Sequence, residues 1–536
     1  MTATFPCQLD HLVVSPEAMF GFGWAIPPRA STTRVWLDLE FADEPPQRVA
    51  VSIDRPREDV AAVFPDNPAA ATAGFMLLAG WPGLPPVAAT LAFEDVDGGC
   101  ETIPLALPPL DAPRRPAGIG WRYLAARAWA HLRLGRLRTA LHKYRELRRR
   151  TRANVVVMPA DDFTVALRGR PVILIVDHSM GGGANTYRDH LIAALTAAGI
   201  AVVLLTFTVS ALSLTVELHE AGHSPRAATC DTLAAVFDML KGIRPSRLVY
   251  NCGVSFPRGL ELCQLLQRLA ERSAARLEVV IHDSYSICPS AFLLDDHGEF
   301  CGVPDRARCR ECLPNHADGF VSLAGCRSID TWRDAWGSLL RRADHIRCFS
   351  DSSQTLLARA YPDLAPRVTV QPHDVPPLPP VRRRPRHPSD PLVVGVIGSI
   401  SLHKGAGVVA DLARAIAADS APVRIVVVGH VDAACPPEVV QQTGGYRRDD
   451  LPELCARHAL DIVLLPSICP ETFSFVAHEV LTMGLPLVAF DLGAPADLAR
   501  AHPLGHVALR RDGPGLLAEI RGFAASLTDP TEPSRA

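Results

Sequence analysis

The chain has 536 residues, 48% of them hydrophobic, and a formal net charge of −3 at pH 7. A chain of this length is too long for one hydrophobic core, and we expect about three domains. The near-neutral charge argues against a general nucleic-acid-binding protein, and no run approaches the ~20 apolar residues that a membrane-spanning helix needs.

The start of the sequence and its cysteine content both favour a cytoplasmic protein. The first residues lack the basic region and apolar stretch of a signal peptide. The 14 cysteines are spread over a chain too long to be a disulfide scaffold, so a reducing cytoplasm is the simpler interpretation.

Residues 1–110 predict a β-sandwich-like accessory domain. Short alternating or β-branched runs at 34–41, 48–53 and 87–93 are separated by proline, glycine and acidic turns. Such spacing is typical of antiparallel strands packed in two layers. This part shows no catalytic constellation, and packing, partner contact and carbohydrate contact are all open as its role.

Residues 111–155 predict a basic helical linker. Between Arg114 and Arg152 there are 13 Lys or Arg residues and one acidic residue, Glu146, so this segment carries +12 and the rest of the chain −15. Tryptophans and leucines recur among the arginines at roughly helical spacing. Basic amphipathic helices can lie on an anionic membrane surface, here the inner face of the cell membrane. A solvated linker helix that packs on the next domain is the alternative.

Residues 156–371 predict a Rossmann-like domain on the acceptor side. Short apolar runs alternate with helical stretches, which is the pattern of a doubly wound parallel sheet. The strands are expected at 171–176, 201–207, 247–250, 277–281 and 345–349.

A second Rossmann-like domain, expected to bind the nucleotide sugar, occupies residues 392–527. Residues 372–391, with eight prolines, predict a stiff linker before it, and 528–536 a flexible tail. We therefore expect an α/β protein in which two Rossmann-like domains face each other across a cleft. The strands of the second domain are expected at 393–397, 423–428, 461–465 and 487–490.

Two polar segments follow strands of the first Rossmann-like domain. Gly181, Gly182 and Gly183 lie between a strand and a helix, where glycines let the backbone approach a ligand; a plain tight turn is the alternative. His282 follows the strand at 277–281, and ligands of open α/β sheets bind at the carboxyl ends of the strands. We expect His282 to bond a sugar hydroxyl, with a structural role as the alternative.

The loop at 286–316 contains four cysteines, Cys288, Cys301, Cys309 and Cys312. Four thiolates could bind a tetrahedral structural zinc ion. Their spacing differs from the usual paired knuckles, so unbound cysteines and a disulfide are alternatives.

Two glutamates, Glu471 and Glu479, stand eight positions apart where an apolar strand meets an amphipathic helix expected at 473–483. Glu471 would lie in the loop at the strand end, and Glu479 about two turns further on, at ~3.6 residues per turn. Two acceptors could bind separate hydroxyl clusters of one ligand while helix N–H groups bind its phosphates. This chemistry suits a nucleotide sugar.

Lys404 follows a predicted strand and loop at 396–403 and directly precedes a predicted helix. Its compact charge could bind a diphosphate together with the helix N-terminus. A solvated surface lysine is the alternative.

Together these residues resemble the family 4 glycosyltransferases, retaining enzymes of GT-B fold. The resemblance covers about 171–511. Within the family, the stretches 282–289 and 466–472 look like bacterial surface-polysaccharide glycosyltransferases. The matches are the pair Glu471 and Glu479, Lys404-Gly405, the Gly181–Gly183 loop, His282-Asp283 and the segment 484–488.

The resemblance implies transfer of a sugar from a nucleotide-diphosphate donor to a glycan or lipid-linked acceptor, without a cofactor or metal for catalysis. It implies that Glu471 engages hydroxyls of the donor sugar and Glu479 the ribose. His282 would contact the donor sugar near the reacting carbon, and Lys404 the diphosphate. The Gly181–Gly183 loop would border the acceptor or a phosphate.

Backbone N–H groups around Thr472, Phe473 and Ser474 would help to bind the diphosphate. The family often has arginine after the strand glycine, Gly398, where this chain has Ser399. Phosphate binding would then depend more on Lys404.

Two other functions fit the same sequence. One is a nucleotide-sugar epimerase of GT-B fold. The other is a non-catalytic sugar- or nucleotide-binding subunit that uses the β-rich domain as a scaffold; the presence of both glutamates, Lys404 and His282 counts against it.

Overall fold

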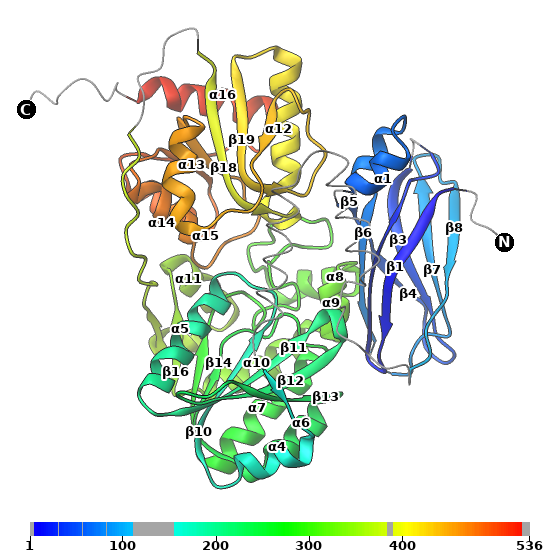
Figure 1. Cartoon of the computed structure of the whole chain (residues 1–536), viewed down its shortest axis with the longest axis vertical. Helices are drawn as coiled ribbons and strands as arrows, with labels where there is room; N and C mark the ends of the chain where they lie inside the picture. The colour runs from blue at the N-terminus through cyan, green and yellow to red at the C-terminus, as the bar shows by residue number, and fades with distance from the viewer. Residues whose placement is uncertain are drawn as a thin grey trace, which may run out of the picture. The chain divides into compact units, whose positions relative to one another are not determined.

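The computed structural model describes residues 5–29, 32–55, 57–81, 83–110, 155–382 and 390–527 (Figure 1). The chain forms two compact units, Met1–Ala291 with Pro304–Arg347, and Phe292–Val303 with Cys348–Ala536. Both the basic segment Arg114–Arg152 and the tail at 528–536 lie outside the described residues, so the membrane contact of that segment stays a prediction. Within the described part of the chain, no helix is long and apolar enough to cross a bilayer.

The N-terminal part of the first unit consists mainly of antiparallel strands, in agreement with the prediction (Figure 1, blue). Two four-stranded sheets, β1-β2-β6-β5 and β4-β3-β7-β8, share one core. Leu37 and Leu39 are fully buried while Asp38 between them is not, because successive side chains of a strand point to opposite faces. The elements are β1 (Cys7–Val14), β2 (Ala18–Ala25), β3 (Thr32–Glu40), β4 (Gln47–Ala50), β5 (Ile53–Arg55), α1 (Glu58–Val63), η1 (Pro68–Thr72), β6 (Gly74–Gly80), β7 (Ala88–Asp95) and β8 (Cys100–Leu105).

The sandwich packs on the rest of the first unit through α9 (Gly319–Ala324). The Ser322 hydroxyl accepts a hydrogen bond from the Gly80 N–H and donates one to the Gly80 carbonyl, both at 3.0 Å. A Cβ on Gly319 would lie 2.6 Å from the Leu78 carbonyl oxygen, so only glycine allows this close approach. The sandwich is therefore a fixed part of the first unit.

The first unit also contains the predicted parallel sheet, as the strands β16-β15-β14-β10-β11-β12-β13-β9 of a nine-stranded order. The ninth strand, β17 (Val368–Val370), falls in the residue range of the second unit. The strands expected from the sequence are all present as β10, β11, β14, β15 and β16. The strands are β9 (Val156–Val157), β10 (Pro171–His178), β11 (Ala201–Thr208), β12 (Ser213–His219), β13 (Arg226–Cys230), β14 (Arg244–Tyr250), β15 (Arg276–Val280) and β16 (His345–Cys348). The helices are α4 (Ala160–Leu167), α5 (Gly183–Ala197), η2 (Val209–Ala211), α6 (Leu233–Met239), η3 (Leu240–Gly242), α7 (Gly259–Ser273), α8 (Arg306–Asn315), α9 and α10 (Ile329–Arg342).

One part of this sheet differs from the prediction of regular strand and helix alternation. β12 and β13 form an antiparallel hairpin next to β11. In β12, Leu214, Val216 and Leu218 are buried and alternate with half-buried residues. This period of two marks a strand buried on one face, unlike the continuous apolar runs of the parallel strands.

The second unit contains a six-stranded sheet in the order β20-β19-β18-β21-β22-β23, and all its pairs are parallel. Val394 and Val396 of β18 lie in one apolar core, whereas Val393 and Ile397 lie in the core on the other face. Burial on both faces explains the continuous apolar run and confirms the doubly wound class. The strands are β18 (Leu392–Ile400), β19 (Val423–Val431), β20 (Val440–Gln442), β21 (Ile462–Leu465), β22 (Leu487–Phe490) and β23 (Gly505–Ala508). The helices are α11 (Asp351–Ala360), η4 (Pro362–Arg367), η5 (Leu402–Lys404), α12 (Ala406–Asp419), η6 (Arg448–Asp450), α13 (Leu451–Arg457), α14 (Phe475–Thr482), α15 (Gly493–Ala501) and α16 (Gly513–Ser526).

The second unit starts earlier in the chain than the proline-rich linker expected at 372–391. Besides Phe292–Val303 it takes in the chain from Cys348 onward, and so includes α11. The hydroxyls of Ser350 and Ser353, at the start of α11, donate to the Thr472 carbonyl at 2.9 and 3.2 Å. These bonds attach α11 to the loop that contains the predicted donor-binding residues.

Candidate functional site

Lys404 lies in a tight loop between β18 and α12. The last residues of β18 before its end at Ile400 include Gly398, with φ 122°, and the exposed Ser399. Gly405, with φ 86°, begins α12, and a Cβ there would lie 1.9 Å from the Pro466 carbonyl oxygen. Only glycine fits this position, and the close approach puts the exposed Lys404 beside the loop that follows β21.

Glu471 lies half-buried in that loop, as the sequence predicted. The Ser467 hydroxyl donates to its carboxylate, and its backbone carbonyl accepts from the Ala494 N–H at 2.9 Å. The pKa of the neighbouring Cys469 is raised to about 12, chiefly by burial and also by the Glu471 charge, while the Lys404 charge opposes the shift. The Ile468 N–H donates to the His403 carbonyl at 3.1 Å, and β18 and β21 are adjacent parallel strands, so Lys404 and Glu471 lie at the same end of the sheet.

Glu479 is a buried residue of α14, 5% exposed, and it is held by an arginine that the sequence did not single out. Its Oε1 accepts from Arg448 Nε at 2.6 Å, and Arg448 also donates to the Pro376 carbonyl. Burial raises the pKa of Glu479, and the ion pair with Arg448 opposes this shift. The ion pair with Arg448 therefore favours the charged carboxylate against the effect of burial.

The three residues predicted to present N–H groups to phosphate lie at the start of α14. Ser474 is the N-cap, and its hydroxyl accepts from the Ala477 N–H at 3.4 Å. Thr472 is held through its carbonyl by the serines of α11. The Phe473 ring stacks on His478 at 4.5 Å and packs against Phe475 at 5.0 Å. The Phe473 side chain thus packs in an aromatic cluster, and its contribution to a phosphate site would come from the backbone.

A segment of the predicted cysteine loop, Phe292–Val303, belongs to the second unit. The Phe292 ring stacks on His403 at 3.9 Å, and Arg359 donates to the Gly302 carbonyl at 3.0 Å. Burial lowers the pKa of His403 to about 4, and the Lys404 charge adds to the effect. His403 is therefore neutral at pH 7. No sequence motif indicated this contact.

Three adjacent strands of the first unit, β15, β14 and β10, end in polar pairs. Their residues are His282-Asp283 after β15, Asn251-Cys252 after β14 and Asp177-His178 at the end of β10. His282 therefore lies at the carboxyl end of a parallel strand, as predicted. Its Nε2 lies 3.0 Å from Asn251 Oδ1. The sequence analysis did not single out Asn251 or Cys252.

The glycine loop at 181–183 joins β10 to α5. Gly181 and Gly182 have φ 91° and 89°, a conformation that favours glycine. Asn185 fixes the loop, because its Oδ1 accepts from the Gly181 N–H at 2.6 Å and its Nδ2 donates to Asp177 Oδ2 at 2.7 Å. A Cβ on either glycine would meet no other described atom within 4 Å, so this side of the loop is open to a ligand.

Asp177, His178 and Cys252 place possible metal-ligand atoms within 4.8 Å of one another. Burial raises the pKa of Asp177 and lowers that of His178. His178 Nδ1 accepts from the Met180 N–H at 3.0 Å, and Cys252 Sγ donates to Asp283 Oδ2 at 2.7 Å. A metal ion at Nδ1 would displace the Met180 bond, and one at Nε2 would require the loss of that nitrogen's proton. The geometry therefore suits a hydrogen-bond network better than a metal centre.

The four cysteines predicted to bind zinc are divided between the units. Cys301 lies in the Phe292–Val303 segment, whereas Cys288, Cys309 and Cys312 belong to the first unit. Cys288 and Cys309 pack against an apolar cluster there, and the buried Arg333 donates to Cys309 Sγ at 3.6 Å. Zinc binding stays a prediction.

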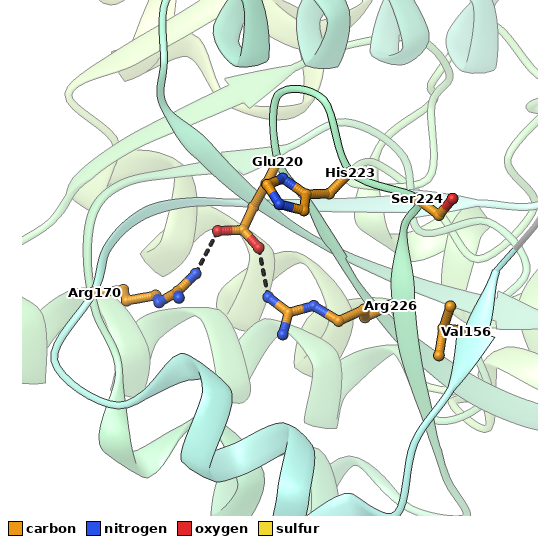
Figure 2. Close-up of a pocket in the computed structure, with 6 residues that line it drawn as sticks. All are labelled: Val156, Arg170, Glu220, His223, Ser224 and Arg226. Carbon is orange, nitrogen blue, oxygen red and sulfur yellow. Dashed lines mark hydrogen bonds and ion pairs between the residues drawn. The ribbon is translucent and has the colours of Figure 1, made fainter.

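A recess of about 440 Å³ lies at the opposite edge of the first unit's sheet, at the amino end of β10 (Figure 2). Arg170 and Arg226 each donate to one carboxylate oxygen of Glu220. Val156, His223 and Ser224 complete its lining. Because β10 runs away from this edge towards His178, the recess is separate from the strand ends that carry His282.

Comparison with known proteins identifies part of the chain. Residues 391–525 match the family described as "Glycosyl transferases group 1". The match includes Lys404, Glu471 and Glu479, so the second Rossmann-like domain is similar to this family over the region that carries these residues. No curated protein matches the chain.

Several solved structures are similar to this chain at low sequence identity. Anabaena Alr3699/HepE in complex with UDP and glucose is 18% identical, with a TM-score of 0.40, over 67% of this chain and 90% of that one. A glycosyltransferase from Rickettsia africae ESF-5 is 12% identical, with a TM-score of 0.40, over 67% and 89%. The lipopolysaccharide outer core galactosyltransferase WaaB, in its apo form, is 12% identical, with a TM-score of 0.36, over 60% and 81%.

The predicted fold class is confirmed. The protein has two α/β domains built on parallel strands, preceded by a domain of mainly antiparallel strands, and the second α/β domain matches the group 1 glycosyltransferases.

Proposed function

We propose that the chain is a retaining glycosyltransferase that moves a sugar from a nucleoside-diphosphate donor to a glycan or lipid-linked acceptor in cell-surface polysaccharide biosynthesis. One observation carries this proposal. The group 1 glycosyltransferase domain holds Lys404 and Glu471 at the carboxyl ends of the adjacent strands β18 and β21. Ligands of open α/β sheets bind at such an edge.

Each residue has a proposed part in donor binding. Lys404 and the N–H groups at the start of α14 bind the diphosphate, because cations and helix N-termini both favour anions. Glu471 accepts from hydroxyls of the sugar. Glu479 accepts from a ribose hydroxyl, and its ion pair with Arg448 supports this role by favouring the charged carboxylate.

In the proposed reaction, the bond between the anomeric carbon and the diphosphate oxygen breaks. The acceptor oxygen bonds to the same face of that carbon, and its proton passes to the departing diphosphate. The chain then needs no separate base. Its residues orient the donor and stabilise the charge that develops on the phosphate, the terms that usually dominate such catalysis.

The test is a transfer assay with the purified full-length chain and a panel of UDP-, GDP-, ADP- and dTDP-sugars, with glycan and lipid-linked acceptors. NMR of the product should show that the anomeric configuration of the donor is kept. Glu471→Gln should lower turnover on the order of 10²-fold, as for loss of one preorganised polar group. Lys404→Ala should raise the donor Kd about 10-fold, the equivalent of ~1.4 kcal/mol, in calorimetry.

Glu453→Gln is the matched control, because this exposed glutamate of α13 pairs only with another exposed side chain in the described residues, Arg457. Normal turnover by a folded Glu471→Gln variant would refute the assignment of Glu471. Conversion of the donor without any acceptor would indicate an epimerase instead. Tight donor binding without turnover across the panel would indicate a binding subunit.

A further inference from the structure

Asn251 and His282 lie side by side at the ends of two adjacent parallel strands. Asn251 directly follows β14, and His282 lies two residues beyond the end of β15. The Asn251 backbone N–H donates to the Val176 carbonyl at 2.8 Å, so its position is tied to β10 as well. The Asn251 side chain is 1% exposed, and its Oδ1 lies 3.0 Å from His282 Nε2.

The orientation of the Asn251 amide follows from its second partner. Its Nδ2 lies 3.0 Å from the Ala184 carbonyl oxygen, which can only accept a hydrogen bond. The reversed amide would place two oxygens against each other at this distance and lose the bond. The nitrogen therefore faces Ala184, and Oδ1 faces His282.

This orientation fixes the proton on the histidine. The amide Oδ1 carries no hydrogen, so His282 Nε2 must be the donor of their bond. A neutral imidazole has a single N–H proton, and the other nitrogen, Nδ1, then carries the lone pair. The Tyr187 ring packs edge-to-face against His282, with 5.2 Å between centroids and 62° between planes, and so restricts the tilt of the imidazole.

We infer that Asn251 is a positioning residue that holds His282 in the tautomer whose Nδ1 accepts a hydrogen bond from a substrate hydroxyl. The tautomer follows from the geometry alone, whereas its effect on transfer rests on the proposed function. The inference also restricts the substrate. The group that meets His282 must donate a proton, so a hydroxyl is accepted and the corresponding O-methyl ether is not.

The tautomer can be measured without any activity. In full-length protein labelled with ¹⁵N and ¹³C histidine, ring NMR spectra distinguish Nε2–H from Nδ1–H, and the His282→Gln variant identifies the signals of His282. We expect Nε2–H in the unmodified protein and loss of this preference in Asn251→Leu. An Nδ1–H ring in the unmodified protein would overturn the inference.

Kinetics then test the positioning role. His282 accepts a hydrogen bond from the substrate rather than acting as a base, and a hydrogen bond of this kind is worth roughly 10-fold, so Asn251→Leu should lower kcat/KM for transfer about 10-fold. Donor Kd should change less than kcat/KM, because the proposed diphosphate and ribose contacts, Lys404 and Glu479, lie on the second unit. In the His282→Gln background, Asn251→Leu should cause no further loss.

The double variant separates positioning from general damage to the fold. If Asn251→Leu lowered kcat/KM equally in the unmodified protein and in the His282→Gln variant, Asn251 would act on folding rather than through His282. Asn315→Leu, at an exposed asparagine of α8, is the matched control and should leave kcat/KM and the melting temperature unchanged. If no donor supports transfer, the proposed function fails, while the NMR result still decides the tautomer.

Discussion

Removal of the Arg448 side chain is the sharpest test of how the second unit keeps a buried carboxylate charged. Glu479 is 5% exposed, and Arg448 Nε lies 2.6 Å from its Oε1. Arg448→Ala deletes this partner and the bond to the Pro376 carbonyl. The pKa of Glu479, already raised by burial, should then rise further, because the charge that opposes the shift is gone.

The expected destabilisation lies between two known limits. Loss of one partner of a fully buried ion pair costs about 3–5 kcal/mol, whereas exposed pairs contribute only about 0.2–1 kcal/mol. The Glu479 side chain is 7% exposed and that of Arg448 38%. We therefore expect Arg448→Ala to destabilise α14 by about 1–3 kcal/mol, after allowance for solvent screening of the arginine.

The pH dependence of this loss has a definite sign. A raised carboxylate pKa destabilises the folded state only where the group would otherwise be ionised. The difference in stability between Arg448→Ala and the unmodified protein should therefore reach its full size at pH values above the pKa of Glu479 in the variant. It should shrink as the pH falls and Glu479 becomes protonated in both proteins.

Hydrogen–deuterium exchange of peptides from α14 is the suitable measurement, because all seven tryptophans fall in the residue ranges of the first unit, and their fluorescence would report on that unit. Arg457→Ala is the control, since its pair with Glu453 is 61% and 73% exposed. Glu479→Gln should restore protection in the Arg448→Ala variant by removing the unpaired charge. Equal exchange in the two arginine variants, or no recovery with Glu479→Gln, would refute the reasoning.

Two further predictions concern the loop that carries Lys404. Gly405→Ala should destabilise the second unit by more than about 1 kcal/mol, on the order of a strained left-handed residue plus a clash with Pro466. Gly407→Ala, in the first turn of α12 where a Cβ would meet nothing within 4 Å, should instead stabilise the unit, by less than the ~1 kcal/mol of a helix interior. Thermal unfolding checks both, and equal melting temperatures would contradict the account. Because the folded pKa of His403 is lowered to about 4, protonation of the unfolded state makes stability fall as the pH drops from about 6.5 to about 4. His403→Phe should flatten the dependence of stability on pH in this range, as measured by calorimetry. An unchanged profile would contradict the assignment of this pH dependence to His403.

Local patterns in the sequence were enough to predict most strands of the two sheets. The run at 393–397 is apolar on both faces because each face of β18 packs in a separate core. The β12–β13 hairpin was missed, although Leu214, Val216 and Leu218 alternate with less buried residues. That period of two lies within the sequence and could have been read from it.

The candidate site divides in the same way between local and distant contacts. Glu471 and Lys404 could be predicted because each follows a buried strand, and strand ends share one edge of a parallel sheet. Arg448 and Asn251 could not, because each meets its partner, Glu479 or His282, across 31 positions of the chain. No motif specifies such a pairing, since the folded backbone alone brings the two residues together.

The charge at the proposed phosphate end depends on how His403 is buried. Ser399 stands where similar enzymes often have arginine, and His403, next to Lys404, could have replaced that charge. Its stack on Phe292 instead removes the ring from water, and burial lowers its pKa to about 4, so the ring is neutral at pH 7. A neutral neighbour does not repel Lys404, but it adds no cation either. The proposed diphosphate would then depend on Lys404 and on backbone N–H groups, and the cost of Lys404→Ala should exceed that of removing one of several cations.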